Sequence, residues 1–108
     1  MERDVKKLAQ LRARTDRQLA DLISTKLDRG FAYARVLAAR ESQASSPAAR
    51  EFQQRAEDAW REANHLLPAL GRDSESGYAA LLRRARILRE VLDQFAVDAL
   101  LIRRAAGF

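Results

Sequence analysis

Apolar residues recur at steps of three and four along three stretches of the chain, a spacing typical of α-helices that bury one face. In the middle stretch these positions are Ala48, Phe52, Ala56, Ala59, Trp60, Ala63, Leu66, Leu67 and Leu70. In the last stretch a heptad-like stripe runs through Leu81, Ala85, Leu88, Leu92, Phe95, Ala99 and Ile102. No segment of useful length alternates apolar and polar residues as a β-strand does. The pattern therefore predicts an all-α protein.

Two short segments rich in Ser, Gly and Pro separate these stretches. Residues 42–47 read Ser-Gln-Ala-Ser-Ser-Pro, which makes Ser46 a good N-cap and Pro47 a good first helical residue. Residues 71–77 begin and end with glycine and contain two serines. Such a segment is typical of a helix stop followed by a new N-cap. Both segments are therefore predicted to be loops between helices.

The first stretch contains one residue that argues against a single helix, Gly30. A glycine inside a helix costs ~1 kcal/mol relative to alanine and also serves as a stop signal. The apolar positions nevertheless stay in phase on both sides of it: Val5, Leu8, Thr15, Leu19, Leu22, Ile23, Leu27, Ala34 and Leu37. We therefore favour one continuous or gently kinked helix, and keep a break near Gly30 as the alternative.

The expected architecture is an antiparallel bundle of three long helices, spanning about 2–43, 47–70 and 76–106. Pro68 predicts that the second helix loosens near Leu67, because proline is poorly tolerated in a helix interior. Ala56, Ala59 and Ala63 are expected to allow close approach of a neighbouring helix. A break near Gly30 would make four helices around the same core. The 108 residues are expected to form a single domain.

Composition excludes several classes of protein. The chain is 47% apolar and 32% charged, which argues against disordered and collagen-like chains. It has no cysteine, which excludes disulfide frameworks and thiolate metal sites. The longest apolar run, Tyr78–Leu82, has five residues, against the ~20 that a membrane span requires. The charged N-terminus does not resemble a secretory signal, so we expect no membrane span and a cytoplasmic location.

Candidate catalytic chemistry is sparse. Glu62 and His65 share the Glu-x-x-His spacing of di-iron proteins, but the motif occurs once and both side chains point away from the apolar face. We therefore expect a solvated surface pair and no metal site. Most serines lie in the two loops, and no glycine-rich phosphate loop occurs. We expect neither an enzyme nor a cofactor.

Four residues of the middle stretch, Ala56, Trp60, Ala63 and Pro68, fall at offsets of four, three and five. This spacing resembles the second helix of a tetratricopeptide repeat, with Trp60 in an aromatic position. The resemblance covers about thirteen of the 108 residues. The first-helix signature is missing, and no second copy follows at that family's period. The resemblance implies helix-hairpin packing and not membership of the family.

The net charge is +5, and the basic residues form two clusters that are candidate polyanion contacts. They are Lys6 and Lys7 in the first stretch and Arg83, Arg84 and Arg86 in the last. Binding of nucleic acid or another polyanion through these residues is our alternative function. It should weaken steeply with salt. Interspersed charges of both signs are also an ordinary solvated surface.

Helix lengths point to uncovered apolar surface. At 1.5 Å per residue the first helix, if unbroken, reaches about 60 Å, and the second covers only about 36 Å of it. Val5, Leu8 and Leu11, with Leu19, are then left uncovered, and Val97, Leu100 and Leu101 lie outside the last apolar stripe. Exposed apolar surface usually marks an interface. The leading expectation is thus a non-enzymatic interaction or assembly module that self-associates or docks a partner helix. In the alternative, a break at Gly30 lets the N-terminal part fold back over Val97 and Leu101.

Overall fold

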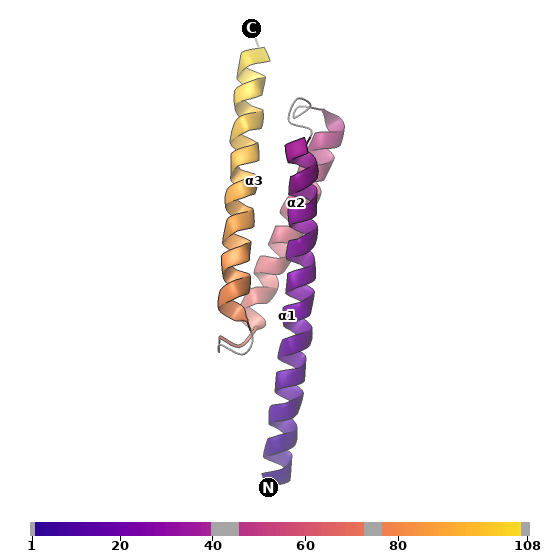
Figure 1. Ribbon diagram of the computed structural model, residues 1–108, viewed down its shortest axis with the longest axis vertical. Coiled ribbons are helices and arrows are strands. Elements are labelled where there is room, and N and C mark those ends of the chain that lie inside the picture. Colours follow the sequence, from indigo (N-terminus) through magenta and orange to yellow (C-terminus); the bar gives the residue numbers. More distant parts are fainter. Residues whose placement is uncertain (1, 40–45, 73–76, 107–108) are drawn as a thin grey trace.

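A computed structural model describes residues 2–39, 46–72 and 77–106 of the chain. These residues form helix α1 (Glu2–Ala39), helix α2 (Pro47–Leu66), the short 3-10 helix η2 (Leu67–Ala69) and helix α3 (Tyr78–Ala106). Figure 1 shows the three α-helices. No strand occurs within these ranges. The predictions of an all-α protein and of three long helices are therefore confirmed. Positions 40–43 and 76, also assigned to helices from the sequence, lie outside the described residues.

Helix α1 is continuous over 38 residues and passes through Gly30 without a break. The structure explains why glycine stands there. A Cβ atom at Gly30 would lie 2.5 Å from Cδ2 of Leu88 on α3, so glycine leaves room for the Leu88 side chain against α1. Gly30 is thus a site of close helix contact and not a helix stop, and the alternative with a fourth helix is not what the described residues show.

The ends of α2 follow the predicted capping signals. Ser46 has extended backbone angles, and its Oγ accepts a hydrogen bond of 3.1 Å from the backbone N–H of Ala49. Pro47 is the first helical residue. At the other end the α-helix stops at Leu66, and the chain tightens into η2 around Pro68. The predicted N-cap and the predicted loosening near the proline are both confirmed.

The three helices overlap only in part, which makes the molecule long and thin. In Figure 1 the chain runs along α1, returns along α2 and reverses again along α3. The molecule measures 73 × 19 × 18 Å, with a radius of gyration of 18.4 Å, against about 13 Å for a compact chain of this length. One end of α1 and one end of α3 therefore project from the region of overlap.

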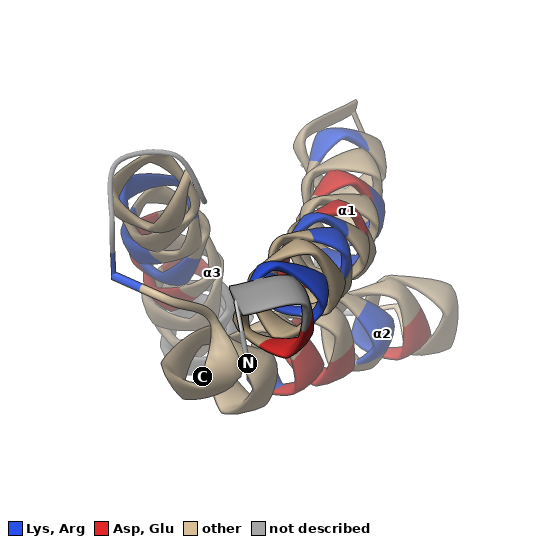
Figure 2. Ribbon diagram, turned by 90° about the horizontal axis from the view of Figure 1, so that it is seen from below, with Lys and Arg blue, Asp and Glu red and all other residues tan. Residues whose placement is uncertain are grey.

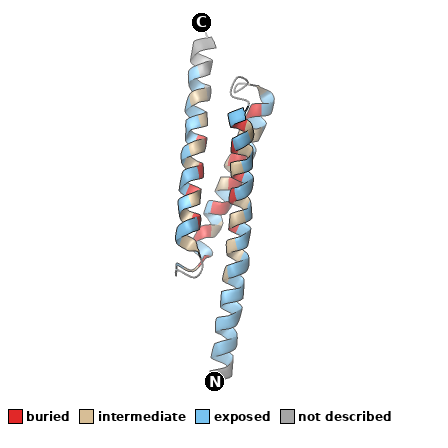
Figure 3. Cartoon of the chain, viewed as in Figure 1, coloured by how far each residue is buried: buried red, intermediate tan, exposed pale blue. Residues whose placement is uncertain are grey.

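The buried core lies where the three helices overlap, at the middle of the molecule (Figure 3). Its residues are small or aliphatic: Ile23, Leu27, Ala34, Ala56, Ala63, Leu67, Leu70, Leu81, Ala85, Leu88 and Leu92. Ala59 is also buried, and Trp60 packs against the edge of the core. The predicted alanine-lined face of α2 is therefore confirmed. At its start the buried residue is Ala49, while Ala48 is exposed, so the apolar stripe begins one residue later than predicted.

We expect Ala59→Leu to lower the free energy of unfolding by roughly 1–3 kcal/mol, because a leucine overpacks a helix contact that holds only a methyl group. Chemical denaturation followed by circular dichroism measures the change. Ala48→Leu, at an exposed position of the same helix, is the matched control and should stay within about 0.5 kcal/mol of wild type. Equal effects of the two substitutions would show that this face of α2 is not packed.

Candidate functional site

The first turns of α1 project beyond the ends of α2 and α3 (Figure 1). Val5, Leu8 and Leu11 are 66%, 66% and 59% exposed, and Figure 3 shows this part of the helix as solvent-exposed. Leu19 is half-buried and packs against the core, so it does not belong to the uncovered surface with which the sequence grouped it. We call residues 5–15 the α1 end.

A groove runs along the α1 end as far as η2. Its lining includes Val5, Leu8, Arg12, Asp16 and, from η2, Ala69. The groove begins where the core stops, so the apolar stripe of α1 continues from the core into solvent. A helix that lay in this groove would extend the packing of the bundle by further turns.

The opposite end of the molecule carries the second uncovered surface, on α3. Val97, Leu100 and Leu101 are 52%, 56% and 56% exposed. At 100° per residue, Val97 and Leu101 project to the side of α3 opposite the buried Leu88 and Leu92. We call residues 90–101 the α3 end. None of the helices in the described residues is long and apolar enough to cross a membrane.

The α1 end does not cover the α3 end within one chain. Because α1 is continuous, its N-terminus lies at one extreme of the molecule, and α3 ends at the other (Figure 1). The alternative in which the N-terminal part folds back over Val97 and Leu101 is therefore not what the described residues show. Both apolar surfaces remain exposed in the single chain.

The structure keeps the candidate polyanion contacts apart. Lys6 and Lys7 are exposed on α1, and Figure 2 shows basic residues around the near end of that helix. Arg83 and Arg86 are exposed on α3, beside Arg84, which bonds to Ser24 of α1. Lys6 and Ser24 are 18 positions apart, which corresponds to about 27 Å of helix between the two clusters.

The Arg84 guanidinium is paired with residues of its own chain. Its guanidinium donates a 2.9 Å hydrogen bond to Oγ of Ser24 and pairs with the carboxylate of Asp28. The same group lies 5.8 Å from the centre of the Phe31 ring. These contacts join α3 to α1 at the edge of the core. Of the five predicted polyanion contacts, Arg84 is thus engaged by a carboxylate of its own chain.

A polar network that the sequence did not reveal joins α2 to α3. The Trp60 indole N–H donates a 2.9 Å hydrogen bond to the carbonyl oxygen of Ala85. The Arg89 guanidinium lies 4.7 Å from the centre of the Trp60 ring and donates to both carboxylate oxygens of Glu57, at 2.6 and 2.7 Å. Asp93 accepts a further bond from Arg89. The hydrogen bonds that Arg89 donates to Glu57 raise the pKa of Arg89 above its ordinary value, so the guanidinium stays charged.

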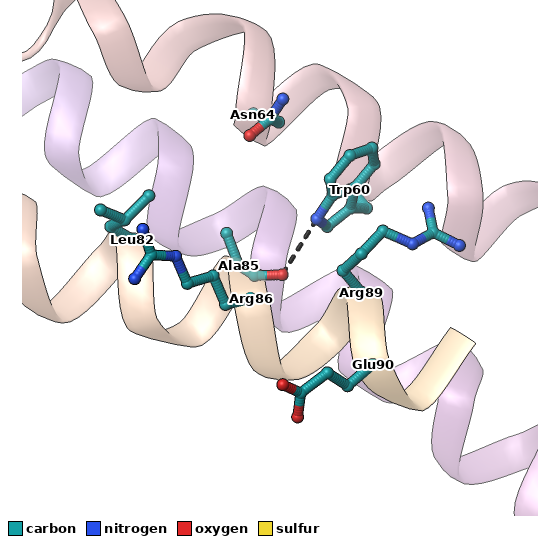
Figure 4. A pocket seen from close by; sticks show the side chains of 7 residues that line it. All are labelled: Trp60, Asn64, Leu82, Ala85, Arg86, Arg89 and Glu90. Carbon is teal, nitrogen blue, oxygen red and sulfur yellow. Dashed lines mark hydrogen bonds between the residues drawn. The ribbon is translucent and has the colours of Figure 1, made fainter. Parts of the chain in front are cut away.

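A small pocket opens beside this network, between α2 and α3. Its lining consists of Trp60, Asn64, Leu82, Ala85, Arg86, Arg89 and Glu90. In Figure 4 the Trp60 indole N–H is directed at the Ala85 carbonyl, and the Glu90 carboxylate points away from the ring. The lining includes no Ser, Thr, Cys, Lys or His side chain. The polar network joins α2 to α3 beside this pocket.

Glu62 and His65 both lie exposed on α2. The Glu62 carboxylate accepts a 2.7 Å hydrogen bond from the ammonium group of Lys26 on α1. Among the described residues, no group of three or more His, Cys, Asp or Glu side chains is placed to hold a metal ion. The carboxylate thus serves as one half of an ion pair between α1 and α2.

Comparison of the chain with models of known families, with curated proteins and with solved structures finds no match. Its function is therefore argued from its own surfaces. Two of these stand out, the α1 end and the α3 end, because each exposes three large apolar side chains on a helix that continues past the core.

Proposed function

We propose that this chain is a non-enzymatic assembly module, a single-domain antiparallel bundle of three helices whose uncovered ends bind helices of a second copy or of a protein partner. The observation that carries the proposal is the exposure of Val5, Leu8 and Leu11 at one end, and of Val97, Leu100 and Leu101 at the other. The order of contacts between helices supports the antiparallel arrangement. Tyr33 of α1 meets Phe52 of α2, while the earlier Lys26 meets the later Glu62.

The free energy available at these ends supports the proposal. Burying a large aliphatic side chain contributes about 1.5–3 kcal/mol. Three such side chains, each somewhat more than half exposed, amount to about 4 kcal/mol at each end. A helix segment without tertiary contacts is only marginally stable in water. A partner helix would therefore stabilise the projecting turns while it binds.

A paired set of variants tests the assembly function. Leu8→Glu with Leu101→Glu replaces one apolar side chain at each end by a side chain of the same charge. Leu22→Glu with Ile87→Glu makes the same changes at positions that are each 46% exposed but lie outside the two ends. We expect wild type and control to associate at micromolar concentration in light scattering, or to retain a partner after cross-linking in a native lysate, and the end variant to do neither.

The measurements distinguish assembly through the two ends from non-specific association of apolar surface. A partner or oligomer that the end variant loses and the control keeps supports the module. The proposal is overturned if wild type is monomeric and the proteins captured by wild type and by the end variant are the same. Circular dichroism of both variants establishes that each substitution leaves the helices folded.

A further inference from the structure

The two uncovered ends carry opposite charge. The α1 end contains four basic residues, Lys6, Lys7, Arg12 and Arg14; Asp4 and Asp16 flank it, so residues 4–16 have a net charge of +2. The α3 end contains three acidic residues, Glu90, Asp93 and Asp98; Arg103 and Arg104 follow it within α3, so residues 90–106 have a net charge of −1. Each end thus combines three exposed apolar side chains with a net charge, and the sign of that charge differs between the two ends.

These charges are largely available to a partner. All four basic side chains of the α1 end are exposed. At the α3 end Glu90 is exposed, and Asp98 is half-exposed and accepts a hydrogen bond from the uncharged Gln94. Asp93 pairs with Arg89, but Arg89 also pairs with Glu57. One guanidinium therefore faces two carboxylates, and the α3 end keeps its negative charge.

We propose that this chain forms a closed pair with a second copy, in which the α1 end of each copy packs against the α3 end of the other. This inference rests on the assembly function proposed above. It specifies a second copy of this chain as the partner and the contact between unlike ends as the interface. Contact between like ends would place four basic residues against four, or three acidic residues against three, which opposes association. Contact between unlike ends brings opposite charges together along an apolar seam.

The dimensions of the two ends suit such a contact. At 1.5 Å per residue the α1 end is about 17 Å long and the α3 end about 18 Å. The centre of the α1 end lies about 12 Å from the start of α1, and the centre of the α3 end about 16 Å from the finish of α3. A two-fold axis across the middle of the 73 Å molecule therefore brings each end of one copy level with the unlike end of the other.

Closure into a pair is favoured by area and by symmetry. A single contact between two three-turn helices buries well under the 1,200–2,000 Å² typical of a stable interface, measured as total buried surface. The closed pair makes this contact twice and places the two cores side by side. Two-fold dimers are also the commonest homo-oligomers. A chain cannot satisfy both ends alone, because they project from opposite extremes of the molecule (Figure 1).

Two single-sided variants test the pairing of unlike ends. In Leu8→Glu an acidic side chain faces the acidic α3 end, and in Leu101→Lys a basic side chain faces the basic α1 end. In the homodimer of each variant, both contacts contain the substituted side chain and are weakened by it. We therefore expect the dimer dissociation constant to rise by about 100-fold in each variant. An equimolar mixture regains one intact contact, and in the other contact the two introduced side chains, which carry opposite charge, face each other and can pair. We therefore expect the mixture to form a heterodimer.

Light scattering and sedimentation equilibrium give the masses, with Leu22→Glu and Ile87→Lys as matched single controls that should dimerise as wild type does. A dimeric wild type, two monomeric variants and a dimeric mixture support the closed pair. A homodimer that survives in either variant points to contact between like ends and overturns it. A mass that keeps rising with concentration, as in an open chain, also overturns it. So does a monomeric wild type, although a monomer that captures a partner through these ends leaves the assembly function standing.

Discussion

Leu88→Ala is expected to lower the free energy of unfolding by about 4 kcal/mol. Leu88 is fully buried in α3 and packs against α1 at Gly30. The substitution removes three carbons from the place where the Leu88 side chain lies against Gly30 of α1, and we expect the helices on both sides to prevent the cavity from closing. Urea denaturation followed by circular dichroism measures the loss. Ile87→Ala, at the exposed neighbouring position, should cost less than about 1 kcal/mol.

A double-mutant cycle with Gly30 tests the physical reason for this effect. In wild type, Gly30→Ala should destabilise the fold, because the new Cβ atom would lie 2.5 Å from Cδ2 of the buried Leu88. In the Leu88→Ala background the same substitution should stabilise it by about 1 kcal/mol, because alanine is the better helix former and the space is free. If Gly30→Ala changed the free energy of unfolding with the same sign in both backgrounds, the contact with Leu88 would not be the reason that position 30 requires glycine.

Trp60→Ala is expected to lower the free energy of unfolding by about 3 kcal/mol. Three interactions are lost together: the packing of the ring against the core, the hydrogen bond to the Ala85 carbonyl and the contact with Arg89. Arg89 keeps its carboxylate partners, so the loss is not increased by an unpaired buried charge. The midpoint of thermal or urea unfolding, followed by circular dichroism in the far ultraviolet, measures the effect.

Trp60→Phe distinguishes the contribution of the aromatic ring to stability from that of the indole N–H group. Phenylalanine retains an aromatic face for Arg89 and most of the packing, but it cannot donate to Ala85. We expect a loss of about 1 kcal/mol, typical of one hydrogen bond. If Trp60→Phe were as damaging as Trp60→Ala, the hydrogen bond and not the packing would be what joins α2 to α3.

Local signals in the sequence predicted the helices and most of their ends. Ser46 and Pro47 begin α2, and Pro68 ends its regular part, because capping and proline geometry act over a few neighbouring residues. Helical periodicity likewise predicted that α1 is continuous. The same periodicity, combined with helix length, correctly predicted that Val5, Leu8 and Leu11 are uncovered.

Partners that are distant in the sequence were not predictable. Glu57 of α2 binds Arg89 of α3, which lies 32 positions further along the chain. Arg84 belongs to a basic cluster that the sequence offers as a polyanion contact, yet it binds Ser24 and Asp28 of α1. Periodicity specifies which face of a helix a residue occupies. It does not specify the rotation of the neighbouring helix, which decides the charge that a residue at the edge of that face will meet.

By itself the sequence determined the helices, the apolar stripe of each and the mismatch in their lengths, because these properties depend on residues a few positions apart. Only the tertiary structure decided the role of Gly30, which the sequence alone left between a helix stop and a mid-helix residue. The answer depends on Leu88, 58 positions along the chain, whose side chain fills the space where a Cβ atom would lie. The tertiary structure also placed the two uncovered ends at opposite extremes of the molecule, since the partial overlap of the helices sets how far each one projects beyond the common core.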